Sequence, residues 1–259
     1  MSEHPDTEAT TDAENLTRPL DLDTVRARLD AIFRNLRDFD PAPARGRLAQ
    51  AGIGWLKGMA DQGALYFAAV DAGIPGAAAP NVRLFLELSM MIQWLHEDGE
   101  AALDSLIRKA QNEASKAQEF FGPLWTKETL EDIDFLLSIE TGHDRSGDRR
   151  AAVKHMAEVL GTKASYLGWW EQTRYSHGTM DLAIAYAPAA ASGVLAKGSP
   201  PGIEFAVPIQ LALLLSVGFV ARILRAEGDQ SVGTRLLDAY FGGINDGLRE
   251  RGFQTESGE

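Results

Sequence analysis

The sequence contains no cysteine among its 259 residues, which excludes disulfide bonds and thiolate chemistry. Valine, isoleucine and threonine are sparse beside alanine and leucine, and no segment sustains the period-two alternation of a half-buried strand. The scarcity of β-branched residues and the lack of alternation both favour helix over sheet. The apolar fraction of 45% and the charged fraction of 24% are those of a globular chain that can bury a large core.

Several catalytic signatures are missing as well. The five histidines show no HExxH or other metal-ligand spacing, so the sequence predicts no metal site and no cofactor. The chain also lacks a GxxxxGK[ST] phosphate loop, a GxGxxG fingerprint and a GxSxG elbow. P-loop, dinucleotide and serine-hydrolase chemistry therefore have no support.

The chain has fewer basic residues than acidic ones, 25 lysines and arginines against 37 aspartates and glutamates. Its formal net charge is −12 and its pI is about 4.9, which disfavours non-specific nucleic-acid binding. Net charge says nothing about a single cleft, so a local basic pocket could still accept RNA. Residues 1–24 are acidic and polar rather than basic and then apolar, so no secretory signal is predicted and a cytoplasmic location is expected.

One long uncharged run is present, from Phe205 to Ala221. Its 17 residues are at the lower edge of what a membrane span requires, and it contains Pro208 and Gln210. We interpret it as a buried helix of a bundle, and no membrane partner is expected.

Apolar residues at helical spacing, interrupted by proline and glycine, predict helices over most of the chain. The predicted helices span 22–39, 47–72, 80–95, 100–121, 126–138, 149–160, 164–177, 203–225 and 231–248, with a charged loop at 140–150. The predicted fold class is all-α, a single helical bundle of about eight or nine helices with a buried apolar helix near the C-terminus. A disordered acidic tail (1–20), one all-helical domain (21–250) and a frayed tail (251–259) are the expected parts.

Glycine recurs inside the predicted helix 47–72, at positions 52, 54, 58 and 63. Each costs about 1 kcal/mol in a helix interior, so close helix–helix contact is the expected compensation. Glycine-rich helices of this kind also make a homodimer the candidate oligomer. The partners are otherwise unknown from sequence.

Arg83 and Glu87 stand four residues apart on one face of an otherwise apolar helix. Charges in such a setting are costly unless they are paired or hydrogen-bonded. Two interpretations remain open: a buried tether to neighbouring helices, or a polar wall of a pocket.

Arg174 and His177 lie three residues apart near a predicted helix end, and Thr173 shares their face. A histidine can exchange a proton near neutral pH, and an arginine can hold a phosphate. This pair is the minimum set of side chains for metal-independent RNA cleavage, because the ribose 2′-hydroxyl supplies the nucleophile. The alternative is a helix-end histidine that binds backbone carbonyls or a carboxylate.

Aromatic residues surround the same helix. Trp169 and Trp170 indicate either core packing or a base-stacking platform, and Tyr166 can supply a hydroxyl to the region. A further candidate is an apolar small-molecule cavity lined by Trp94, Trp170 and Phe205.

Two stretches together resemble a known group of proteins. They are Asn81-Val-Arg83-Leu-Phe-Leu-Glu87 with Ile92-Gln-Trp94-Leu-His-Glu-Asp98, and His155-Met-Ala-Glu158 with Tyr166 and Thr173-Arg-Tyr-Ser-His177-Gly. The pattern resembles a widespread bacterial family of uncharacterised all-helical proteins, which is placed near HEPN domains and abortive-infection proteins.

The resemblance implies a helical bundle, a stress- or phage-response setting and metal-independent ribonuclease activity through His177 and Arg174. The usual HEPN motif has a longer spacer between arginine and histidine than the two residues found here. We therefore expect first a non-enzymatic helical module that acts through protein contacts. The alternatives are an RNA- or nucleotide-directed HEPN-like enzyme and a small-molecule-binding bundle.

Overall fold

The computed structural model describes residues 22–41, 46–176 and 205–250. These residues contain eight α-helices and three 3₁₀-helices and no strand, which confirms the predicted all-α class. The predicted tails 1–20 and 251–259 lie outside the described residues.

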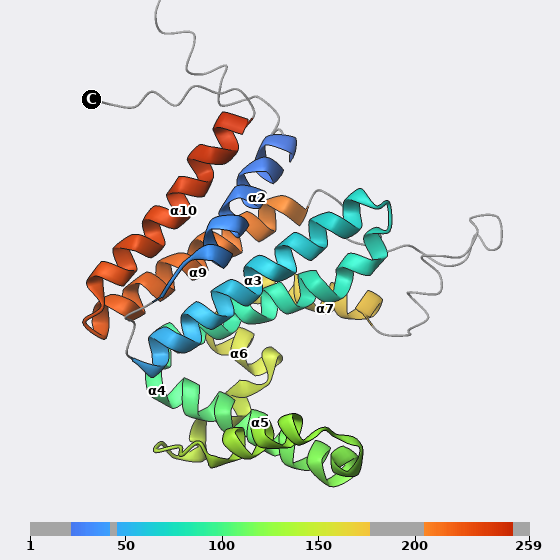
Figure 1. Cartoon of the computed structure of the whole chain (residues 1–259), viewed down its shortest axis with the longest axis vertical. Coiled ribbons are helices and arrows are strands. Elements are labelled where there is room, and N and C mark those ends of the chain that lie inside the picture. Colours follow the sequence, from blue (N-terminus) through green and yellow to red (C-terminus); the bar gives the residue numbers. More distant parts are fainter. Residues whose placement is uncertain (1–21, 42–45, 177–204, 251–259) are drawn as a thin grey trace, which may run out of the picture.

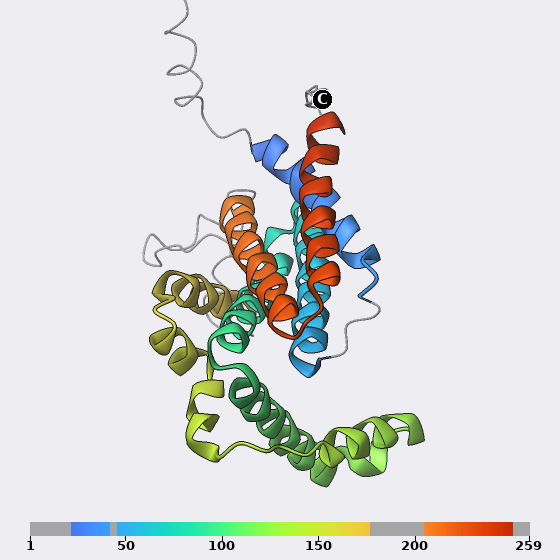
Figure 2. The ribbon, with the colours of Figure 1, turned by 90° about the vertical axis from the view of Figure 1, so that its left-hand side faces the viewer.

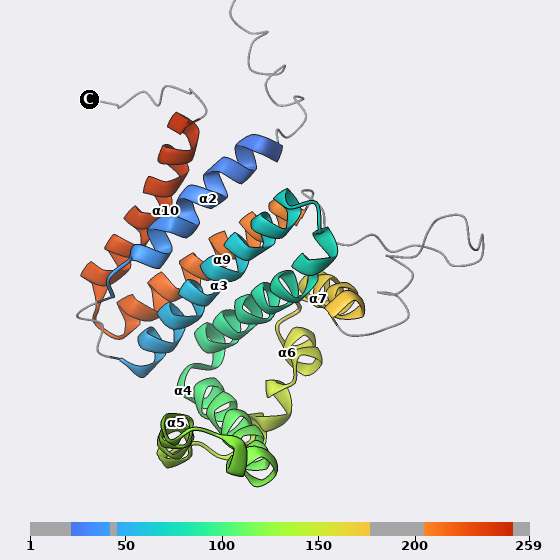
Figure 3. The ribbon, with the colours of Figure 1, turned by 45° about the vertical axis from the view of Figure 1, so that its right-hand side comes forward.

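Five helices form the main bundle (Figures 1 and 3). They are α2 (Leu22–Asp38), α3 (Arg47–Asp71), the first half of α4 (Ala79–Phe121), α9 (Ala206–Ala226) and α10 (Gln230–Glu250). A short 3₁₀-helix, η1 (Pro75–Ala78), connects α3 to α4.

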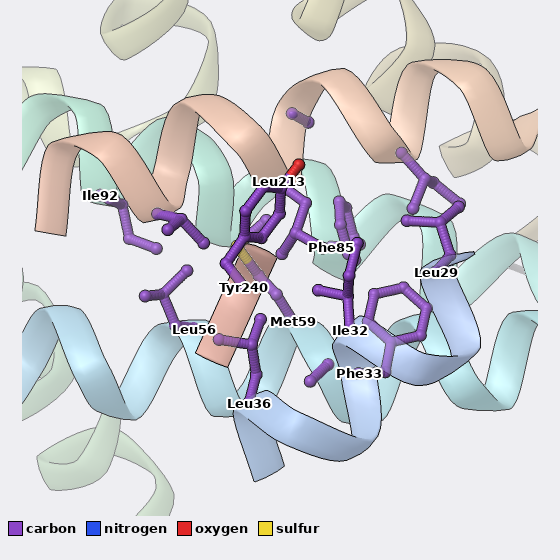
Figure 4. Close-up of a cluster of buried hydrophobic side chains, with 14 of the residues drawn as sticks. Leu29, Ile32, Phe33, Leu36, Leu56, Met59, Phe85, Ile92, Leu213 and Tyr240 are labelled. Atoms are coloured by element: carbon purple, nitrogen blue, oxygen red, sulfur yellow. The ribbon is translucent and has the colours of Figure 1, made fainter. Parts of the chain in front are cut away.

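The bundle core is assembled from side chains of all five helices (Figure 4). Phe33 of α2, Met59 of α3 and Phe85 of α4 meet Leu213 of α9 and Tyr240 of α10, and all five are buried. Burial of each such side chain stabilises the fold by about 1.5–3 kcal/mol. The helical spacing of apolar residues in the sequence is therefore the main source of this architecture.

The predicted apolar helix near the C-terminus is α9, which contacts α3, α4 and α10. One face of α9 is buried through Leu213, Val217 and Val220, whereas Leu211 and Leu215 are exposed. It is the one described helix that is long and apolar enough to cross a membrane, and 44% of its most apolar window is buried in the fold.

Glycines bring helices into close contact. A Cβ at Gly243 of α10 would lie 2.6 Å from the Cα of Ile32, and one at Gly247 would lie 2.5 Å from the Cα of Arg28. On α3, a Cβ at Gly63 would lie 2.2 Å from the Phe33 ring, so the close packing expected of the α3 glycines is present there. The face of α3 at Gly54 is open instead.

Helix α4 bends at Gly99, whose φ of 57° and ψ of −132° are not helical. This backbone region is open essentially to glycine alone, which explains the residue at the bend. Beyond it, the second half of α4, the 3₁₀-helix η2 (Gly122–Leu124) and α5 (Lys127–Ser138) form a helical hairpin, residues 100–138, that we call the arm. The Thr126 side chain caps α5 by accepting a hydrogen bond from the Thr129 amide at 3.3 Å.

The remaining elements are η3 (Arg145–Ala151), α6 (Val153–Val159) and α7 (Lys163–Ser176). The sequence predicted a charged loop at 140–150 and a helix from 149. The structure instead places a 3₁₀-helix over part of this segment and begins α6 at Val153. The Asp144 side chain accepts a hydrogen bond from the Ser146 amide at 2.9 Å, which starts η3. In Figure 2 the arm extends away from α6 and α7.

Candidate functional site

Arg83 and Glu87 of α4 share a contact with Trp169 of α7. The Trp169 indole Nε1 donates a hydrogen bond to Glu87 Oε2 at 3.2 Å. The Arg83 guanidinium lies 5.1 Å from the centre of a ring of the same indole, within cation–π range. All three side chains are half-buried. The arrangement is a tether between α4 and α7, one of the two interpretations left open by the sequence.

Tyr166 stacks on Trp169 with ring centres 5.6 Å apart. Tyr166 also lines an apolar groove between α6 and α7, which has a volume of about 410 Å³. The groove is lined by Lys154, Ala157, Glu158, Lys163, Tyr166, Leu167 and Trp170. Trp170 is 47% exposed and faces solvent while Trp169 faces the bundle, so the paired indoles divide between surface and core.

The side chains around the predicted catalytic pair are engaged locally. Thr173 Oγ1 donates to the Trp169 carbonyl at 2.8 Å, which ties this hydroxyl to the helix backbone. The Arg174 guanidinium lies 5.6 Å from the centre of a Trp170 ring. His177 lies outside the described residues, so the Arg174–His177 pairing stays a prediction. Gln172, on the same helix, is buried, and its Oε1 has no hydrogen-bond partner within the described segments.

Trp94 belongs to the core and not to the groove. It is buried in a cluster with Met90, Ala102 and Met156. Its indole Nε1 donates to Asp98 Oδ2 at 2.8 Å, and Arg150 Nη1 donates to the same oxygen at 2.8 Å. Phe205 packs against the main bundle core. Of the predicted trio Trp94, Trp170 and Phe205, only Trp170 lines the groove.

Asp104 forms a polar junction at the base of the arm that the sequence analysis missed. Its carboxylate is 1% exposed. Arg47 Nη2 of α3 donates to Oδ1 at 3.0 Å, while the amides of Gly142 and His143 donate to Oδ2 at 2.8 and 3.0 Å. The His143 Nδ1 lies 2.9 Å from the same Oδ2.

The pKa of Asp104 reflects two opposing effects. Burial by itself raises the pKa of this carboxyl, but the hydrogen bonds from His143, Arg47 and Gly142 outweigh it and lower the pKa to about 2. Asp104 is therefore ionised at neutral pH. Its carboxylate links α3, the arm and the segment that leads to η3 through the hydrogen bonds that it accepts.

Arg108 extends this junction by one turn of the arm. Its Nε donates to Asp148 Oδ1 at 2.8 Å, and its guanidinium also donates to the carbonyls of His143 and Asp144 at 3.0 and 2.9 Å. Each of these partners lies more than 30 residues away along the chain, so the buried Asp104 and the half-buried Arg108 together fix the arm to η3. An aspartate within the apolar run Ala101–Leu106 is the signal that could have indicated the junction.

The outer end of the arm is apolar and exposed. Phe120 is 79% exposed and Leu124 81% exposed, and Phe121 is partly exposed between them. The Phe121 ring contacts those of Phe120 and Trp125, with ring centres 4.8 and 6.5 Å away. We call Phe120, Phe121 and Leu124 the arm tip. On α5, Phe135 is 71% exposed and no residue of the helix is buried.

Charge is divided between the arm and the helices that line the groove. The arm, residues 100–138, contains eight acidic residues and four lysines and arginines. Residues 153–176, which form α6 and α7, contain three lysines and arginines and two acidic residues, in a chain whose formal net charge is −12. The arm is therefore acidic, whereas the helices that line the groove carry one more basic side chain than acidic ones.

In the described part of the chain, no group of three or more histidine, aspartate or glutamate side chains is arranged to hold a metal ion. No protein-family model, curated protein or solved structure matches the chain.

Proposed function

We propose that the chain is a helical interaction module that binds a protein partner through the arm tip. The observation that carries the proposal is the arm itself, a hairpin that projects from the bundle with large apolar side chains in solvent at its end. Exposed apolar clusters rimmed by charge are typical of protein-binding surfaces.

The energetics of the arm support a partner. A helix is stabilised in proteins mainly by burial of its apolar face, and α5 has no buried residue. Leu130, Ile133 and Leu137 of α5 are only half-buried against α4. A partner that covered the tip would remove Phe120 and Leu124 from water, which stabilises a complex by about 1.5–3 kcal/mol for each side chain.

The contacts of α4 and α7 support a non-enzymatic role. Glu87 and Trp169 hold two helices together, and the Thr173 hydroxyl binds the backbone. These groups hold helices together, and a module that acts through protein contacts requires no further chemical role for them. The resemblance to abortive-infection proteins adds a stress- or phage-response setting to the proposal.

A second candidate is an RNA- or nucleotide-directed enzyme that uses His177 and Arg174. The observation that favours it is the exposed Trp170, with the Arg174 guanidinium over its ring. An exposed indole beside a cation is a suitable platform for a nucleic-acid base.

Radical footprinting read by mass spectrometry tests the module. The labelling of Phe120 and Leu124 is compared between cells that produce the chain and the purified chain at high dilution. We expect protection of both side chains in cells, while Phe241, which is exposed on α10 far from the arm, is labelled alike in both samples. Equal labelling of Phe120 in the two samples would overturn the proposal.

A further inference from the structure

The groove between α6 and α7 has the chemistry of a receptor for apolar side chains. Tyr166, Leu167 and Trp170 line it, together with Lys154 and Lys163. Its volume of about 410 Å³ is within the range of sites that enclose a small ligand or a few large side chains. One acid, Glu158, is also present and lies 4.0 Å from Lys154.

The arm tip has the complementary chemistry. Phe120 and Leu124 are the two most exposed large apolar side chains of the described residues. Glu119 is adjacent to the tip, and Glu128, Glu131 and Asp132 follow on α5. The molecule therefore has two exposed apolar surfaces: the arm tip, on an acidic helical hairpin, and the α6–α7 groove, which has two lysines in its lining.

The two surfaces of one copy do not meet. The arm extends away from α6 and α7 in Figure 2, and the junction of Asp104, Arg47 and Arg108 fixes its base. The tip is therefore placed to contact a different molecule. Opposite charge favours the groove of another copy over a second arm, because two acidic arms repel one another.

We propose that the arm tip of one copy docks into the α6–α7 groove of a second copy. The proposal rests on the proposed function, and it names the partner as the chain itself. Phe120 and Leu124 fill the groove over Trp170, and the acids of α5 approach Lys154 and Lys163. Because tip and groove are different surfaces, the contact is heterologous, and a pair of copies keeps one free tip and one free groove between them. Successive copies then form a ring or an open chain.

Two complementary variants test this assembly. The tip variant is Phe120→Ser with Leu124→Glu, and the groove variant is Lys163→Glu with Trp170→Ala. All four positions are exposed, so both variants are expected to fold, which circular dichroism verifies. Phe135→Ser, on the arm but outside the tip, is the matched control and keeps wild-type assembly.

Light scattering coupled to gel filtration gives the masses. We expect each variant alone to be a monomer of 28.1 kDa, and their equal mixture to form a dimer of about 56 kDa, because one intact tip and one intact groove remain. The wild-type chain forms assemblies larger than the dimer, which weaken as salt is raised. Assembly by the tip variant alone, or a wild-type chain that is monomeric at every concentration, would overturn the inference.

A monomeric mixture also overturns the inference, and it leaves the proposed function separable from it. If Phe120 and Leu124 are nevertheless protected in cells, the tip binds another protein and only the second copy is excluded. If neither protection nor assembly is observed, both proposals fail.

Discussion

The indole Nε1 of Trp169 lies 3.2 Å from Glu87 Oε2 and connects α7 to the centre of the bundle. This contact explains why two charged residues occur on the apolar first half of α4. Arg83 contacts the ring and Glu87 accepts from its nitrogen, so one indole serves both side chains.

Trp169→Phe removes the indole N–H donor, so the half-buried Glu87 carboxylate loses that hydrogen bond. We expect the free energy of unfolding to fall by about 1.5–3 kcal/mol, the range for a hydrogen bond to a charged group. Urea denaturation followed by circular dichroism measures the change. Trp170→Phe, on the exposed neighbour, is the control and is expected to cost about 0.5 kcal/mol or less. Equal losses for the two variants would show that the tether is not stabilising.

Asp104→Asn replaces the buried carboxylate at the base of the arm. At neutral pH we expect a loss of about 2–4 kcal/mol, because three N–H donors lose a charged acceptor. Urea denaturation gives the value, and hydrogen exchange of the Gly142 and His143 amides reports release of the loop. Asp132→Asn, on an exposed face of α5, is expected to change stability by about 0.5 kcal/mol at most.

The pH dependence of the same variant has a definite sign. The pKa of Asp104 is lowered in the fold to about 2, from an unfolded value of about 3.9. Its stabilisation is therefore complete above about pH 4 and is lost as the pH falls toward about 2. The stability difference between wild type and Asp104→Asn is expected to shrink over that interval. A difference that stays constant from pH 5 to about 2.5 would contradict the assigned pKa.

Gly243→Ala tests the close approach of α10 to α2. The added Cβ would lie 2.6 Å from the Cα of Ile32, which is backbone and has no rotamer to change. We expect a loss of about 2 kcal/mol or more, in the range of overpacked cores. Gly242→Ala is the matched control, since its Cβ would lie 3.6 Å from Asn35 Nδ2 and alanine favours helix. A neutral Gly243→Ala variant in thermal denaturation would contradict this packing.

A ribonuclease assay distinguishes the proposed interaction module from the proposed enzyme. Since Thr173 binds the helix backbone and Arg174 lies over Trp170, we expect the purified wild-type chain and Arg174→Ala to leave a labelled single-stranded RNA equally intact. His177→Ala is compared in the same gel assay. Cleavage by wild type that His177→Ala abolishes, while its helicity and urea midpoint are unchanged, would establish the enzyme in place of the module.

Local features of the fold were readable from sequence. Apolar spacing predicted a helix at 22–39, and the structure has α2 at Leu22–Asp38. The helices predicted at 80–95 and 100–121 left a break between them, and α4 bends there at Gly99. The 3₁₀-helix η3 was missed because residues 145–151 are short, polar and stabilised by distant partners such as Arg108, so they have no apolar period to detect.

The candidate site was predictable in part. Arg83 and Glu87 could be identified as residues in need of partners, either as a tether or as a polar wall of a pocket, because charges on an apolar helix are costly when unpaired. Trp169 could not be named as that partner, because the rotation of α7 against α4 decides which of two adjacent indoles faces inward. Asp104 and its donors were missed for a related reason: Arg47 and His143 are distant in sequence, and only the folded chain brings them together.

The arm tip was not recognised at all. In sequence, Phe120, Phe121 and Leu124 have the appearance of core residues at a helix end, and exposure becomes visible only when the hairpin is seen to project from the bundle. The acidic character of the arm was present in the sequence, yet it acquires meaning only once the hairpin is seen to project from the bundle.

Photo-crosslinking at the arm tip tests the central claim most directly. Benzoylphenylalanine is placed at Leu124, and for comparison at Lys116, an exposed polar position on the same arm. After irradiation of the producing cells, we expect a protein adduct heavier than the 28.1 kDa chain at position 124 and none at 116, with mass spectrometry identifying the attached protein. A chain that stays uncrosslinked at position 124, or that is crosslinked equally at 116, would contradict the claim that the arm tip is a binding surface.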